Sequence, residues 1–145
     1  MGLDSQNRSN ASLTYVFFAF IVSLVATLGS LFFSEIMHFV PCSLCWYQRI
    51  FMYSLVFLFL INLLFPDDKV FKYTILLVLF GWIISIYHNL LMFGIIPENL
   101  APCVQGVPCS TVYINWLGFI TIPLLSFFAY TTILILLVKM KKELN

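Results

Sequence analysis

Two cysteines separated by two residues stand at the edge of a strongly apolar run. The stretch reads VPCSLCWYQR and holds Cys42, Cys45 and, four residues after the second cysteine, Arg49. A disulfide across C-x-x-C closes a very short loop, and the stabilisation by a disulfide grows with loop length. The same spacing at a helix N-terminus lowers thiol pKa values and favours thiol exchange. We therefore interpret this pair as a redox element.

A second pair, Cys103 and Cys109, lies in the stretch PCVQGVPCS. Four thiolates could also hold a zinc ion tetrahedrally, but C-x5-C lies outside the usual ligand spacing of such sites. We predict two redox pairs and no metal. Two purely structural disulfides remain an alternative at this point.

The cysteines belong to a chain whose composition is that of an integral membrane protein. Of its 145 residues, 62% are hydrophobic and 9% are charged, whereas about a quarter of the residues of a soluble domain are charged. Four long gaps separate the charged residues, each near or above the ~20 residues with which a helix crosses a bilayer. We predict one domain over residues 1–145, an all-α bundle of four transmembrane helices with two external cysteine-containing loops. The expected spans are about 12–33, 46–65, 70–93 and 113–138, the last with a kink at Pro123.

The basic residues predict the orientation of these spans, because lysine and arginine in short loops are retained in the cytoplasm. Six of the seven fall on one side: Arg8, Lys69, Lys72, Lys139, Lys141 and Lys142. The opposite loops, 34–45 and 94–112, contain no lysine or arginine and hold all four cysteines. We expect a multi-pass protein of the cell membrane with both termini in the cytoplasm. Its cysteines would then face an oxidising compartment, where disulfides persist.

The seventh basic residue, Arg49, would lie inside the second span. An arginine there costs a few kcal/mol unless it is paired or snorkels to the headgroups, so by default it indicates function. It shares a helix face with Cys45, one turn away. Gln48 adds donors and an acceptor, and Trp46 adds flat aromatic surface. Such surroundings suit a flat, lipid-soluble molecule with carbonyl oxygens, which describes a quinone; snorkelling is the alternative.

Three stretches together resemble a known family. They are PCSLCWYQR at the start of the second span, PCVQGVPCS in the other external loop, and YINWLGFITIPLLSF after it. In this order they resemble the DsbB family of disulfide-bond-forming quinone reductases, and the short second cysteine loop looks most like its Gram-positive BdbC branch. The resemblance covers nearly the whole chain. Classical Gram-negative members separate the second pair by a much longer segment, so any loop rearrangement here must be smaller or different.

The resemblance implies an activity and an order of electron transfer. The chain would reoxidise an extracytoplasmic DsbA/BdbD-like thioredoxin-fold oxidase and pass the electrons to a membrane quinone, with menaquinone favoured over ubiquinone. The partner would attack Cys103, the released Cys109 would attack Cys42, and Cys45 would become the thiolate beside the ring. Arg49 would support binding and reduction of the quinone.

The resemblance also assigns His88, in the stretch SIYHN, to the surroundings of the quinone; a hydrogen-bonded histidine at the membrane interface is the alternative. Two other functions stay open. One is a quinone reductase like those of the vitamin K epoxide reductase family, which share a four-helix architecture. The other is a non-catalytic four-span protein with structural disulfides. Beside the quinone, the partner protein and the lipid bilayer, we expect no nucleic acid as a partner, since the sequence has no nucleic-acid-binding patch.

Overall fold

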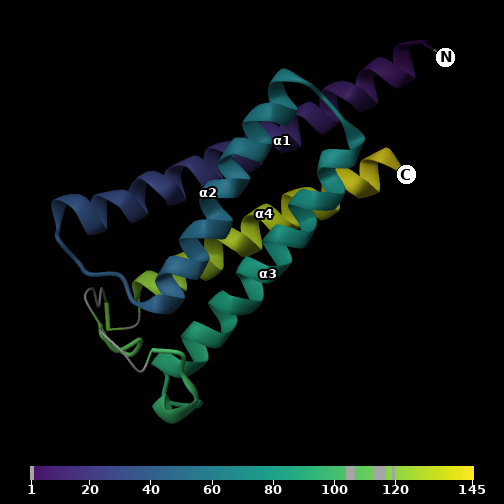
Figure 1. The fold of residues 1–145 in the computed structure, drawn as a ribbon. Helices are drawn as coiled ribbons and strands as arrows, with labels where there is room; N and C mark the ends of the chain where they lie inside the picture. The colour runs from purple at the N-terminus through teal and green to yellow at the C-terminus, as the bar shows by residue number, and fades with distance from the viewer. Residues whose placement is uncertain (1, 104–106, 113–116, 119) are drawn as a thin grey trace.

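A computed structural model of the chain describes residues 2–103, 107–112, 117–118 and 120–145, and these residues form a bundle of helices (Figure 1). The four long helices are α1 (Gly2–Leu31), α2 (Ser43–Leu64), α3 (Asp68–Met92) and α4 (Ile122–Leu144). Each contains an apolar stretch long enough to cross a membrane. The prediction of an all-α protein with four membrane-spanning helices is confirmed.

The helices pack in a ring, with α1 and α3 each lying against both α2 and α4. Both chain termini and the short connection between α2 and α3 lie at one end of the bundle (Figure 1). The N-terminus of α2 and the connection between α3 and α4 lie at the other end. The two cysteine pairs, which belong to these latter segments, are therefore brought to one end of the molecule.

Buried apolar side chains from all four helices fill the ring. The core contains Val16, Ala19, Met52, Leu55, Phe59, Val78, Tyr130, Ile133, Leu137 and Met140. At Gly81 in α3, an added Cβ atom would overlap the ring of Tyr130 in α4. The absence of a side chain at Gly81 is therefore what allows these two helices to approach so closely at this level.

Short irregular segments end α1 and interrupt the connection after α3. The last turn of the first membrane segment is a π-helix over Phe32–Ile36, and a single 3-10 turn covers Glu98–Leu100. Asp67 caps α3, where its carboxylate accepts a hydrogen bond from the backbone N–H of Lys69 at 2.9 Å. Such a cap satisfies one of the free N–H groups at a helix start.

The fourth helix begins at Ile122, well after the predicted start of the span at residue 113. Residues 113–116 of that prediction lie outside the described part of the chain. Leu117 and Gly118 form a turn with φ angles of 55° and 83°, in a left-handed region that a helix cannot use. Pro123 stands in the first turn of α4, where its missing N–H costs no hydrogen bond. The predicted kink at Pro123 is therefore wrong, because this proline starts the helix.

Candidate active site

The first cysteine pair begins α2, as the sequence predicts. Cys42 is the N-cap, and its sulfur accepts a hydrogen bond from the backbone N–H of Cys45 at 3.4 Å. The two sulfur atoms lie 3.1 Å apart, and both cysteines are free thiols. The N-cap position places the Cys42 sulfur among free backbone N–H groups and at the positive end of the helix dipole, which both favour a thiolate.

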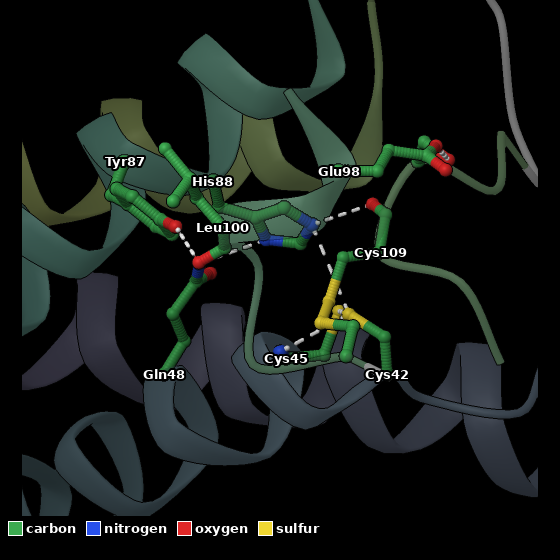
Figure 2. The surroundings of a disulfide bond; sticks show 10 residues. Cys42, Cys45, Gln48, Tyr87, His88, Glu98, Leu100 and Cys109 are labelled. Atoms are coloured by element: carbon green, nitrogen blue, oxygen red, sulfur yellow. Dashed lines mark hydrogen bonds between the residues drawn. A yellow bond between two sulfur atoms is a disulfide. The ribbon is translucent and has the colours of Figure 1, made fainter. Parts of the chain in front are cut away.

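The second pair is joined as a disulfide between Cys103 and Cys109. Cys109 is buried, with 4% of its surface exposed, while Cys103 is half-buried. The sulfur atoms of Cys42, Cys103 and Cys109 all lie within 4.8 Å of one another. In Figure 2 the side chain of Cys109 reaches toward those of Cys42 and Cys45, and the sulfur atoms gather in one place. Two pairs that are far apart in the sequence therefore form one sulfur cluster.

This cluster also bears on the question of a metal. The sulfurs of Cys42 and Cys45 lie within 4.8 Å of a ring nitrogen of His88 and of each other. Three ligands of this kind could start a zinc site. The disulfide, however, removes the thiolates of Cys103 and Cys109 as further ligands. That no metal binds stays a prediction.

His88 from α3 bridges the two pairs. Its Nε2 lies 3.1 Å from the backbone oxygen of Cys109 and 3.8 Å from the sulfur of Cys42, and its Nδ1 lies 3.1 Å from Nε2 of Gln48 (Figure 2). A carbonyl oxygen can only accept, so Nε2 carries the hydrogen. In a neutral imidazole Nδ1 then accepts, and the Gln48 amide donates to it. His88 is only 1% exposed and Gln48 only 5%.

The surroundings of Cys42 lower the pKa of its thiol well below the ordinary value. The largest cause is the hydrogen bond from the Cys45 thiol, and the hydrogen bonds from His88 and from the backbone N–H of Cys45 act in the same direction. Burial acts in the opposite direction and is outweighed. In the reduced pair these contacts favour the thiolate form of Cys42.

Arg49 lies one turn beyond Cys45 and is held by two neighbours. Its Nη2 donates a hydrogen bond to the backbone oxygen of Ser30 in α1 at 3.0 Å. Its guanidinium carbon lies 5.6 Å from the centre of the Trp46 ring, within the range of a cation–π contact. Trp46 itself is 54% exposed on the outside of the bundle. The arginine is thus fixed in place by protein groups.

A pocket opens beside the sulfur cluster and encloses roughly 870 Å³, its open mouth included. Its polar wall includes Cys45, Gln48, Arg49 and His88, and most other lining residues are apolar side chains of the four helices and the cysteine loops. Few polar groups in an apolar hollow are typical of a site for a mainly apolar ligand. Three of the four predicted cofactor contacts line it, while Trp46 lies beneath the arginine.

Several contacts that build the site carry no sequence signal. The hydroxyl of Tyr130 in α4 donates to the backbone oxygen of Gln48 at 2.7 Å, and Tyr87 donates to the backbone oxygen of Leu100 at 2.9 Å. Together with the Ser30 carbonyl, these acceptors are backbone atoms. Any residue type could supply them, so only the fold identifies them.

The chain is similar to known proteins over most of its length. The family model described as "Disulfide bond formation protein DsbB" matches residues 12–140. The chain is 46% identical to disulfide bond formation protein C of Bacillus subtilis (strain 168) over 131 residues, which cover 90% of this chain and 95% of that protein. It is 44% identical to the probable disulfide formation protein C of Halalkalibacterium halodurans over 117 residues, which cover 81% of this chain and 85% of that protein. No solved structure gives a significant match.

Proposed function

Because the chain belongs to the DsbB family of disulfide bond formation proteins, we propose that it reoxidises an extracytoplasmic thioredoxin-fold dithiol protein and passes the electrons to a membrane quinone. The family establishes the coarser activity, that of a membrane disulfide oxidoreductase. One observation carries the finer proposal. The Cys42 sulfur lies within 4.8 Å of both sulfurs of the second pair, and its neighbour Cys45 lines the pocket with Arg49.

Electrons enter at the second pair. Cys103 is more exposed than Cys109, which supports attack by a thiolate of the partner on the Cys103 sulfur. The Cys103–Cys109 bond breaks, a mixed disulfide with the partner forms, and Cys109 leaves as a thiolate. Cys109 then attacks Cys42 in an oxidised Cys42–Cys45 pair, and Cys45 leaves as a thiolate at the pocket.

The second half of the exchange restores the second pair. The partner's second thiolate attacks the partner sulfur that is bonded to Cys103, closes the partner's disulfide and releases Cys103 as a thiolate. Cys103 attacks Cys109, re-forms the Cys103–Cys109 disulfide and frees Cys42 as a thiolate. The partner has then lost two electrons and the first pair has gained them. The structure has a joined second pair and free thiols at Cys42 and Cys45. This is the redox state that the series of exchange steps would leave, which supports the proposed order.

The pocket fits a quinone by the chemistry of its walls. Apolar side chains can receive the ring, and the guanidinium of Arg49 has five N–H donors, of which Ser30 engages one nitrogen. Arg49 would bind a carbonyl oxygen, Trp46 would hold the guanidinium, and Gln48 and His88 would line the inner end beside Cys45. A bound quinone would supply the acceptor for two electrons. The likeness to the Gram-positive relatives favours menaquinone over ubiquinone.

The proposed orientation places the cysteine end of the bundle outside the cytoplasmic membrane. The connection between α2 and α3 lies with both termini at the other end (Figure 1). Lys69 follows this connection in the first turn of α3. With basic loops retained in the cytoplasm, that end faces inward. The thiols then meet an oxidising compartment and a soluble partner.

The experiment that tests the proposal follows quinone absorbance with purified protein in detergent. Reduced thioredoxin-fold partner is added with menadione or with ubiquinone-1, and two-electron reduction of a quinone is expected to depend on the protein. Cys45→Ser serves as the inactive control. A protein with only structural disulfides would reduce neither quinone, and its two pairs would resist mild reductants. That result would overturn the proposal.

A further inference from the structure

We propose that His88 is a catalytic residue of the exchange between the two cysteine pairs, with its Nε2–H donating a hydrogen bond to the Cys42 sulfur as this sulfur leaves. Gln48 is the positioning residue that holds the imidazole in the required tautomer. The inference rests on the proposed function and deepens it. It gives these two residues a role between the sulfur pairs, which is distinct from contact with a quinone.

The hydrogen-bond partners of the imidazole fix where its hydrogen lies. The Cys109 backbone oxygen, 3.1 Å from Nε2, accepts only, so the hydrogen is on Nε2. Gln48 offers an amide nitrogen 3.1 Å from Nδ1, which donates to the lone pair on that atom. The backbone oxygen of Gln48 is itself bound by the Tyr130 hydroxyl at 2.7 Å. Gln48 is therefore held through both its backbone and its side chain.

One N–H group thus faces both reacting residues. Nε2 lies 3.8 Å from the Cys42 sulfur as well as 3.1 Å from the Cys109 oxygen. Through the Cys109 carbonyl the histidine holds the second pair in place, and through the Cys42 sulfur it can stabilise negative charge on the first. Small movements of Cys109 would let this N–H turn fully toward the sulfur.

Burial makes this hydrogen bond count. His88 is 1% exposed, and apolar neighbours Leu44, Leu91 and Ala101 pack around the sulfur cluster. Water therefore has little access to solvate a thiolate that forms there. A hydrogen bond in such low-dielectric surroundings is stronger than in water, and a charged group left without one costs more.

The step in which His88 acts is the release of Cys42. The Cys103 thiolate attacks the Cys109 sulfur, a Cys103–Cys109 bond forms, and the Cys42–Cys109 bond breaks with its electron pair on the Cys42 sulfur. No proton has to move, since Nε2 keeps its hydrogen and only shares it with the new thiolate. Because a thiol leaves faster when its thiolate is stabilised, the histidine accelerates this exchange.

A background that lacks only Cys45 isolates this step from both quinone and partner. In Cys45→Ser, three cysteines can form either the Cys103–Cys109 disulfide with free Cys42 or the Cys42–Cys109 disulfide with free Cys103. Acid quenching, alkylation of the free thiol and peptide mass spectrometry measure the ratio of the two isomers. We expect the isomer with free Cys42 to dominate, because its thiolate receives the His88 hydrogen bond.

Substitution of the histidine should shift that ratio. His88→Leu in the Cys45→Ser background should move it roughly tenfold toward the Cys42–Cys109 isomer, the effect of losing one hydrogen bond to a charged group. His88→Gln, which keeps an N–H near the position of Nε2, should recover part of the shift. Gln48→Leu should shift the ratio in the same direction, and its effect should shrink at low pH, where Cys42 is a neutral thiol in every variant.

The other histidine of the chain supplies the control. His38 is exposed, so His38→Gln should leave the isomer ratio unchanged. An unchanged ratio in both His88→Leu and Gln48→Leu, with helix content retained, would overturn the inference. Failure of the unsubstituted protein to reduce quinone would instead count against the proposed function.

Discussion

The sulfur of Cys42 lies within 4.8 Å of the sulfur of Cys109, although one caps α2 and the other follows α3. The neighbouring α2 and α3 bring the two segments to the same end of the bundle (Figure 1). Cys109 is also held from both sides, by His88 at its carbonyl and by the adjacent Ser110, whose hydroxyl donates to Glu98. In the proposed relay, the short second loop would therefore need only a small rearrangement to pass its electrons to the first pair.

The proposed order of electron transfer makes two cysteine substitutions differ. Cys109→Ser should trap a mixed disulfide between Cys103 and the partner, because the thiolate that would continue the relay is missing. Cys45→Ser should leave the second pair exchangeable but abolish quinone reduction. Non-reducing electrophoresis detects the trapped complex, and quinone absorbance follows the second step.

A result at one position would contradict this order. If Cys45→Ser reduced quinone at a rate near that of the unsubstituted protein with excess reduced partner, the first pair would not be part of the relay. Cys42 and Cys45 would then have only a structural role. Cys103→Ser is the matched control, since it should form no mixed disulfide at all.

Arg49 should matter for the quinone step far more than for folding. Arg49→Met removes the donors that face the pocket, and the loss of a hydrogen bond to a charged group, ~1.5–3 kcal/mol, corresponds to a fall of roughly ten- to a hundredfold in quinone kcat/KM. Arg49→Lys should recover only part, because lysine lacks the planar fork that binds Ser30 and stacks on Trp46. Unchanged quinone kinetics in Arg49→Met would leave the residue as a membrane anchor only.

The lowered pKa of Cys42 predicts a characteristic pH profile. The titratable groups that face its sulfur are Cys45 from α2 and His88 from α3. In the reduced protein, the rate of alkylation of Cys42 by iodoacetamide should stay level as the pH falls below the ordinary thiol pKa, and should decline only near the lowered value. The thiolate stabilises the folded protein above the unfolded pKa, and this contribution is lost as the pH falls toward the folded pKa.

Substitution of the histidine provides the comparison for that profile. In His88→Leu the inflection should move to higher pH, because one donor to the thiolate is gone. In His38→Gln it should stay where it is. A profile of Cys42 that follows an ordinary thiol in the unsubstituted protein would contradict the cause assigned to the shift.

The sequence predicted those parts of the fold that charge and composition determine. α2 and α3 lie within a few residues of the predicted spans 46–65 and 70–93, because charged or turn-forming residues flank them. The predicted start of α4 was wrong because the apolar run continues through Leu117. Hydropathy cannot reveal the positive φ angle of this residue. Composition predicts which residues can lie within the membrane, but it does not predict at which residue a helix begins.

The candidate site was predictable in its residues but not in their arrangement. The C-x-x-C spacing pointed to the first cysteine pair, and the cost of an unpaired arginine inside a membrane helix pointed to Arg49. Gln48 and His88 are 40 residues apart, and nothing local indicates that an amide fixes the tautomer of a ring. That relationship depends on the packing of α2 against α3.

Labelling with a membrane-impermeant maleimide would test the orientation. In intact cells or protoplasts after mild reduction, Cys103 or Cys109 should react. Cysteines engineered at Lys69 or Lys141, in a chain without the native cysteines, should stay protected until the membrane is opened. Labelling of the engineered positions in sealed cells would mean that the orientation is the reverse of the predicted one. The cysteine pairs would then not face an oxidising compartment.

Two helix glycines offer a matched pair for testing how the scaffold supports the site. At Gly81 an added Cβ atom would overlap the ring of Tyr130, whereas at Gly29 no atom lies within 4 Å of it. Gly81→Ala must therefore displace the Tyr130 ring or push α3 and α4 apart, and overpacking of this kind typically costs about 1–3 kcal/mol. Gly29→Ala should be neutral or slightly stabilising, because alanine favours a helix over glycine.

The consequence of Gly81→Ala should extend to the active site. The Tyr130 hydroxyl donates to the backbone oxygen of Gln48, and the Gln48 side chain donates to His88. Displacement of the ring should therefore slow the relay between the cysteine pairs as well as lower the midpoint of thermal unfolding in detergent. Tyr130→Phe, which removes only the hydroxyl, should reproduce part of the kinetic effect with a smaller loss of stability. Equal midpoints for Gly81→Ala and Gly29→Ala would mean that the Tyr130 ring and the two helices can shift without cost, and that the close approach at Gly81 does not hold the site together.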